Sequence, residues 1–171
     1  EQNSHIVLID TGNSYQGLCE LIHRKTKGED GIYYTYTEEK PISFNPFFTD
    51  DYKFSVEKKD SIKTLLLALW KGEDEKITKT ESGELGSAVS AYIRRIQQNR
   101  DIVPSFDTFY EYMLNDYRKE LAARDIKVSR KDFNIDNFLT TLRQYYKGGR
   151  YDFLLNSNEN IDLLHKRFIV F

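Results

Sequence analysis

Two glycines near the start of the sequence could do phosphate chemistry. Gly12 and Gly17 have the spacing of the glycines in a phosphate-binding loop, G-x-x-x-x-G-K-[ST], and they follow the apolar run His5–Ile9, which predicts a strand. The next residues are Leu18 and Cys19, so the lysine that contacts the β- and γ-phosphates and the hydroxyl that holds Mg²⁺ are both missing. We therefore expect the chain by itself neither to bind nor to hydrolyse ATP.

Metal and nucleophile chemistry is also poorly supported. Cys19 and His23 are four residues apart and share one face of a predicted helix, but two ligands do not make a metal site, and His5 and His165 belong to other elements. We predict no metal site. In a helix, a lone cysteine is typical of a small core residue rather than a nucleophile.

A basic and aromatic stretch, Arg143–Tyr151, has the composition of single-strand nucleic-acid binders. Tyr145 and Tyr146 also continue the apolar stripe of a predicted helix, which favours packing over base stacking. The chain has a formal net charge of −2, with 25 basic and 27 acidic side chains, so its overall charge does not attract nucleic acid or anionic membrane. Nucleic acid is a possible partner that the charge does not indicate.

Length and composition describe a folded chain. It has 171 residues, of which 39% are hydrophobic and 30% charged, and this excludes a disordered or low-complexity protein. No apolar run is long enough to cross a membrane, so we expect no direct membrane insertion. The single cysteine cannot form an internal disulfide, which suits the cytoplasm.

The elements that position these residues change in kind along the chain. Up to about residue 54 the pattern is strand, turn, helix and strand, and the two strands are His5–Ile9 and 32–37. The helix between them can be capped by Asn13 or Ser14. Its apolar residues Leu18, Leu21 and Ile22 lie on one face. The last residues, Phe168–Phe171, form another apolar run that is typical of a buried parallel strand. We expect this strand and His5–Ile9 to run parallel in one sheet.

Between residues 55 and 165 the apolar period becomes helical. Ser55 can cap a first helix that carries Leu65–Trp70, a second helix holds Leu85–Ile96, and Ser105 can cap a third. A fourth covers 135–146 and stops at Gly148. The third has the clearest apolar stripe, which includes Leu114. We expect Phe109, Met113 and Tyr117 of this stripe to be buried against the 65–70 segment. The fold class is therefore mixed α/β, mainly helical, with four helices forming a bundle-like subdomain.

Two motifs resemble one protein family. The pattern D-x-G-x-S-Y ends the first strand, and F-N-P-F follows the second; in this chain they are Asp10, Gly12, Ser14 and Tyr15, then Phe44, Asn45, Pro46 and Phe47. At this spacing the pair resembles the conjugative-transfer ATPases of type IV secretion systems, specifically the TraG type found on bacterial conjugative transposons. The resemblance runs through the whole chain.

The resemblance implies a RecA-like P-loop motor with an inserted helical subdomain. Residues 1–54 and 166–171 would form part of the motor sheet, and 55–165 the insertion. The chain would be a central fragment, inactive by itself, that lacks the phosphate loop (Walker A) and the Walker B residues. The parent protein would use ATP and Mg²⁺, self-associate, bind other secretion-channel subunits, and work in the cytoplasm at the inner face of the membrane.

The resemblance also assigns the motif residues. It places Asp10, Gly12 and Ser14 near the nucleotide and gives structural roles to Tyr15 and the 44–47 turn. Ser14 stands where many relatives have glutamate, so a helix-capping role is expected for it instead of catalysis. No catalytic set is complete in the chain.

Two other interpretations remain open at the level of sequence. The chain could be a stand-alone helical protein–protein interaction module with a small sheet. It could also be a nucleic-acid binder that uses Arg143–Tyr151. Bare apolar strands at both ends argue against the first because unpaired strand edges promote aggregation, and the near-neutral charge argues against the second.

Overall fold

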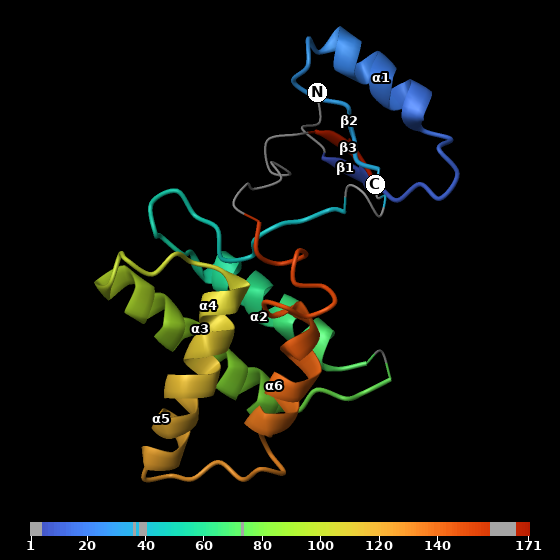
Figure 1. Cartoon of the computed structure of the whole chain (residues 1–171). Helices are drawn as coiled ribbons and strands as arrows, with labels where there is room; N and C mark the ends of the chain where they lie inside the picture. Colours follow the sequence, from blue (N-terminus) through green and yellow to red (C-terminus); the bar gives the residue numbers. More distant parts are fainter. Residues whose placement is uncertain (1–4, 36, 38–40, 73, 158–166) are drawn as a thin grey trace. The chain divides into compact units, whose positions relative to one another are not determined.

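The computed structural model describes residues 5–35, 37, 41–72, 74–157 and 167–171 (Figure 1). Residue contacts divide the chain into two compact units, 1–44 with 159–171, and 45–158. The fold is mixed α/β, with a small three-stranded parallel sheet in the first unit and helices in the second. The assignment of motor sheet and insertion, divided at residue 54, stays a prediction.

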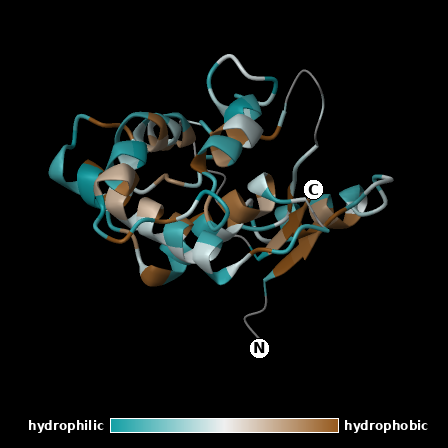
Figure 2. Ribbon diagram, turned by 90° about the horizontal axis from the view of Figure 1, so that it is seen from below, coloured by the Kyte–Doolittle hydropathy of each residue, from teal (hydrophilic) through white to brown (hydrophobic). Residues whose placement is uncertain are grey.

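The sheet of the first unit joins segments from both ends of the chain. Strand β1 (Ile6–Leu8) pairs in parallel with β3 (Phe168–Val170), which pairs in parallel with β2 (Ile32–Tyr33), so the order is β1-β3-β2. The prediction that the first and last apolar runs lie parallel in one sheet is confirmed. The central strand β3 is fully buried, and the strands are hydrophobic along their length (Figure 2).

Helix α1 (Gln16–Lys25) packs on β2 and β3, but through only one of the three residues that periodicity predicts for its buried face. Its buried residue is Cys19, which clusters with Phe168 and Val170, while Ile22 is partly buried beside them. Leu18 and Leu21 are 44% and 50% exposed.

Gly31 fixes how closely β2 approaches α1. Its φ is +76°, and a Cβ atom there would lie 2.5 Å from both the Cys19 carbonyl oxygen and the His23 backbone nitrogen. Only glycine fits this position because a side chain would overlap the helix backbone. The close approach lets the small Cys19 side chain fill the space between helix and sheet.

The helices of the second unit start at the residues that cap them. Helix α2 (Val56–Trp70) begins after Ser55, and α3 (Lys79–Gln98) begins after Thr78, which forms a capping box with Glu81. Ser105 caps α4 (Phe106–Tyr112), and Asn134 caps α6 (Ile135–Leu142). The capping roles of Ser55 and Ser105 are thus confirmed. Each cap side chain accepts a backbone N–H that helix geometry leaves unpaired.

The third predicted helix contains a π-helical segment. Helix α4 continues into the π segment η1 (Met113–Tyr117) and then α5 (Arg118–Ala123). The i→i+5 bonding of such a segment shifts the buried stripe by one residue. This explains why Leu114 is 39% exposed while Tyr112 and Tyr117 are both buried. The predicted fourth helix is α6, followed by the 3₁₀ turn η2 (Arg143–Tyr145).

An aromatic core connects these helices. The Phe109 ring lies 5.2 Å from the Phe47 ring and 5.4 Å from the Tyr92 ring on α3, measured between centroids. Phe109, Met113 and Tyr117 are all buried, as their spacing predicts. The rings beside Phe109 lie on α3 and in the 45–47 turn, while its packing against the 65–70 segment of α2 stays a prediction. Trp70 of α2 instead packs edge-on against Phe133 and Phe138.

Candidate functional site

The candidate site of the first unit lies where its parallel strands end. Asp10 follows β1, and its backbone N–H donates to the Phe171 carbonyl just beyond β3, at 2.6 Å. Tyr33 closes β2, on the other side of β3. Parallel sheets bind ligands at this carboxyl edge, so the residues gathered there are candidates for a functional site.

The Asp10 carboxylate organises the turn that follows it. Its Oδ1 accepts the Gly12 N–H at 3.1 Å, and its Oδ2 accepts the Tyr15 N–H at 2.9 Å. The pKa of Asp10 is lowered below its usual value, mainly by the hydrogen bond from the Tyr15 N–H and further by those from Gly12 and Ser14. Partial burial of the carboxylate opposes this shift. Asp10 is therefore ionised at neutral pH and holds residues 10–15 in a fixed turn.

Tyr33 and Asn13 complete this cluster. The Tyr33 hydroxyl donates to Asp10 Oδ2 at 3.2 Å and to Asn13 Oδ1 at 2.9 Å, so its one proton is shared by two acceptors. Partial burial and the neighbouring Asp10 carboxylate raise the pKa of Tyr33. Asn13 has φ +56°, a left-handed conformation that asparagine tolerates better than most residues. Sequence reasoning missed Tyr33, because nothing in a strand of aromatic residues marks the one that faces the Asp10 turn.

The predicted cap of α1 is wrong. Neither Asn13 nor Ser14 caps the helix; Tyr15 is the N-cap residue and its side chain makes no capping bond. The Asp10 carboxylate instead accepts the backbone N–H of Tyr15 itself, so it holds the residue before the helix and does not cap the first helical turn. Ser14 itself is exposed, as are Gly12 and Tyr15.

The glycine spacing does not produce a phosphate loop. Gly17 lies inside α1, not in a loop before it, and a Cβ there would contact nothing within 4 Å. The N–H groups of Gly12 and Tyr15, which could otherwise face an anion, point to the chain's own Asp10 carboxylate. These residues consequently do not fit an ATP triphosphate. Within the described parts of the chain, no three side chains of the histidine, cysteine and acidic types gather to hold a metal ion.

The second motif lies at the start of the second unit. Asn45 is buried; its Oδ1 accepts the Phe47 N–H at 2.9 Å, and its Nδ2 donates to the Pro104 carbonyl at 2.8 Å. Phe47 is fully buried in the aromatic core, and Pro46 is buried beside it. These hydrogen bonds anchor the turn 45–47 to the segment that leads into α4. Phe44 is only partly buried.

The basic and aromatic stretch 143–151 packs on itself and on α4. The Tyr146 and Tyr110 rings stack with centroids 4.5 Å apart, and the Tyr145 and Tyr151 rings stack at 5.8 Å. The Arg143 guanidinium lies 5.1 Å from the Tyr146 ring. These ring faces are already covered, which favours the packing interpretation over base stacking.

Comparison with known proteins gives one family. The model of the family described as the TraG P-loop domain matches residues 1–171. No curated protein matches the chain. No solved structure matches it either. In the part of the chain that the structure describes, no helix is both long and apolar enough to cross a membrane. Because the family model covers the whole sequence, the chain belongs to the TraG P-loop domain family.

Proposed function

We propose that this chain works as part of a longer P-loop ATPase that powers conjugative transfer through a type IV secretion channel, of the type carried by conjugative transposons. The observation that supports this most is the match to the TraG P-loop domain over residues 1–171. The Asp10 turn supports it further, because it lies at the carboxyl edge of a parallel sheet, where P-loop proteins bind nucleotide.

In this proposal the chain supplies two parts of the motor. Residues 1–54 and 166–171 form part of a RecA-like sheet, and 55–165 form an inserted four-helix subdomain. The chain lacks the phosphate-loop lysine and hydroxyl, with Leu18 and Cys19 after Gly17. The parts of the motor that bind ATP and Mg²⁺ therefore come from other segments of the parent, and the chain is inactive by itself.

Exposed apolar side chains in the first unit favour a larger assembly. Ile6 and Val7 of β1 are 46% and 59% exposed, and Leu18 and Leu21 of α1 are exposed to a similar extent. Parallel strands are normally covered on both faces, so these side chains need partners. Further motor segments of the parent would cover them, which supports this function over the stand-alone interaction module.

The Asp10 turn has a positioning role in this proposal. Asp10, Gly12 and Ser14 face the nucleotide edge of the sheet, and Asp10 holds the turn rigid through the N–H groups of Gly12 and Tyr15. The 44–47 motif is structural, since Asn45 and Phe47 are anchored in the second unit. The parent acts as an oligomer with other channel subunits at the cytoplasmic face of the inner membrane.

Rates of ATP hydrolysis by the parent protein test the proposal. We expect Asp10→Ala to lower the rate by roughly tenfold or more because the turn loses its anchor. Asp125→Ala is the matched control, since Asp125 is exposed and has no partner among the described residues. Equal rates for the two variants, or no hydrolysis by the parent itself, would contradict the proposal.

A further inference from the structure

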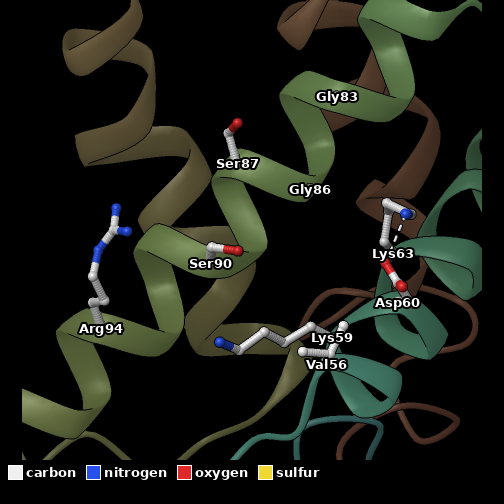
Figure 3. A pocket seen from close by; sticks show the side chains of 9 residues that line it. All are labelled: Val56, Lys59, Asp60, Lys63, Gly83, Gly86, Ser87, Ser90 and Arg94. Atoms are coloured by element: carbon white, nitrogen blue, oxygen red, sulfur yellow. Dashed lines mark hydrogen bonds and ion pairs between the residues drawn. The ribbon is translucent and has the colours of Figure 1, made fainter.

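A polar groove runs between α2 and α3 in the second unit, with a volume of about 430 Å³ (Figure 3). On α2 it is lined by Lys59, Asp60 and Lys63, and on α3 by a stripe that includes Ser87, Ser90 and Arg94. None of these residues belongs to the motifs discussed above. The opposite faces of the same helices carry core residues such as Ile62 and Leu85, so the groove side faces solvent.

The groove is positively charged in a chain whose net charge is negative. Three cationic side chains line it against one carboxylate. Lys63 Nζ donates to Asp60 Oδ1 at 2.8 Å, which neutralises one of the three. Within the described part of the chain, the side chains of Lys59 and Arg94 make neither an ion pair nor a hydrogen bond, and it is the backbone N–H of Lys59 that donates to the Ser55 carbonyl. Two cations are therefore available to an incoming anion.

The arrangement of the donors is regular. Lys59 and Lys63 are four residues apart on α2, which corresponds to about 6 Å along the helix. Ser87, Ser90 and Arg94 lie on successive turns of α3, and the Lys59 side chain extends from α2 toward this stripe (Figure 3). Ammonium, guanidinium and hydroxyl donors thus line one elongated space.

Two glycines keep this space open. Gly83 and Gly86 lie inside α3, where glycine is among the least favourable residues for a helix. A Cβ at Gly83 would meet nothing within 4 Å, and one at Gly86 would lie 3.4 Å from the Lys63 side chain. Helix packing therefore does not require glycine at position 83. Its effect is to leave the groove without a side chain in its wall.

We propose that the α2–α3 groove binds a phosphate-bearing ligand through Lys59, Arg94 and the hydroxyls of Ser87 and Ser90. Phosphate oxygens accept hydrogen bonds from ammonium, guanidinium and hydroxyl groups at once, so this donor set is complementary to them. The phosphate can belong to a small polyphosphate compound or to the backbone of a single nucleic-acid strand. The chemistry at the groove is the same in both cases.

Calorimetric titration of the chain at low salt tests this inference. The probes are inorganic tripolyphosphate and a single-stranded oligothymidylate, and poly-glutamate serves as an anion without phosphate. The groove variant is Lys59→Gln with Arg94→Gln. The matched control is Lys79→Gln with Lys119→Gln, which removes two exposed positive charges of the second unit outside the groove. A second variant, Ser87→Ala with Ser90→Ala, removes the hydroxyls and improves helix propensity, so it is expected to fold.

Saturable binding of one or both phosphate probes is the expected result. The groove variant should bind roughly tenfold more weakly, the serine variant several-fold more weakly, and the control as the parent chain does. Tripolyphosphate binding identifies a small ligand, whereas binding of the oligonucleotide alone identifies a nucleic-acid backbone. The inference is overturned if neither probe saturates, if the control loses as much affinity as the groove variant, or if poly-glutamate binds as tightly as the phosphate probes.

Discussion

The Tyr33 hydroxyl donates a hydrogen bond to Oδ2 of Asp10, 3.2 Å away, although the two residues are 23 positions apart and lie on opposite sides of β3. The bond joins the ends of two strands that are not neighbours in the sheet. It also links the side chain that holds the 10–15 turn to β2, on the far side of β3. The turn is thus built by tertiary contacts as well as by its own sequence.

Removing this hydroxyl should raise the pKa of Asp10. Tyr33→Phe deletes a donor to the ionised carboxylate, so the pKa of Asp10 should move back toward its ordinary value, while the N–H bonds of Tyr15 and Gly12 hold it partly lowered. NMR titration of the Asp10 carboxyl carbon measures the change. An unchanged pKa would show that the hydroxyl does not interact with the carboxylate in solution.

The same bond network makes stability depend on pH. The pKa of Asp10 in the folded chain lies below its value of about 3.8 in the unfolded chain. The ionised Asp10 carboxylate therefore stabilises the fold fully at pH values above 3.8, and this stabilisation is lost as the pH falls through the lower folded-state pKa. Asp10→Asn should therefore flatten the acid limb of a plot of unfolding free energy against pH. Asp125→Asn, at an exposed site without a described partner, should leave that limb unchanged.

The sequence predicts elements better than it predicts which side chains meet. Periodicity and capping residues locate α2, α3 and the 106–123 helix, because these signals are local. They fail at Leu18 and Leu21, which are exposed because α1 meets the sheet through Cys19 and Ile22. They also fail at the π segment, whose i→i+5 bonding shifts the stripe at Leu114.

In the candidate site too, the sequence predicts local features but not the side chains that meet through long-range contacts. Asp10 and Gly12 stand out in the sequence because a strand end followed by a turn is a local pattern. Tyr33 does not, because its role depends on the order β1-β3-β2, and β3 comes from the other end of the chain. Long-range pairing of this kind is invisible to a search for short motifs.

Asn45 should be important for the stability of the second unit. Asn45→Ala removes two buried hydrogen bonds and leaves the Pro104 carbonyl and the Phe47 N–H unpaired, at an expected cost of about 2 to 3 kcal/mol. Asn99→Ala is the matched control, because Asn99 makes a similar local bond to the Asp101 N–H on the exposed surface. Urea unfolding compares the two. Equal midpoints would mean that the 45–47 turn does not anchor the unit.

Two glycines should respond to alanine in opposite directions. Gly83→Ala is expected to stabilise the chain by about 0.5 to 1 kcal/mol, because it removes a helix-interior glycine at a site with open space. Gly31→Ala should destabilise it strongly, since the new Cβ would overlap the Cys19 carbonyl and the His23 backbone at 2.5 Å. Thermal unfolding gives both values. A stable Gly31→Ala variant would contradict the close approach of β2 to α1.

Phe109 should behave as a core residue. Phe109→Ala removes a fully buried ring from contact with Phe47 and Tyr92, at an expected cost of about 3 to 5 kcal/mol. Leu114→Ala on the same helix is the control, because that side chain is 39% exposed and should cost far less. If Phe109→Ala leaves the thermal midpoint within about two degrees of the parent chain, the stripe is not part of the core.

In the proposed function, this chain contributes the sheet and the helical subdomain of a P-loop ATPase without a nucleotide-binding loop of its own. Calorimetric titration with Mg-ATP tests it most directly, using the chain with Lys59→Gln and Arg94→Gln so that phosphates bound in the α2–α3 groove do not contribute. We predict no binding by this chain and saturable binding by the parent ATPase carrying the same two substitutions. Micromolar binding near one nucleotide per chain, or no binding by the parent, would contradict the account.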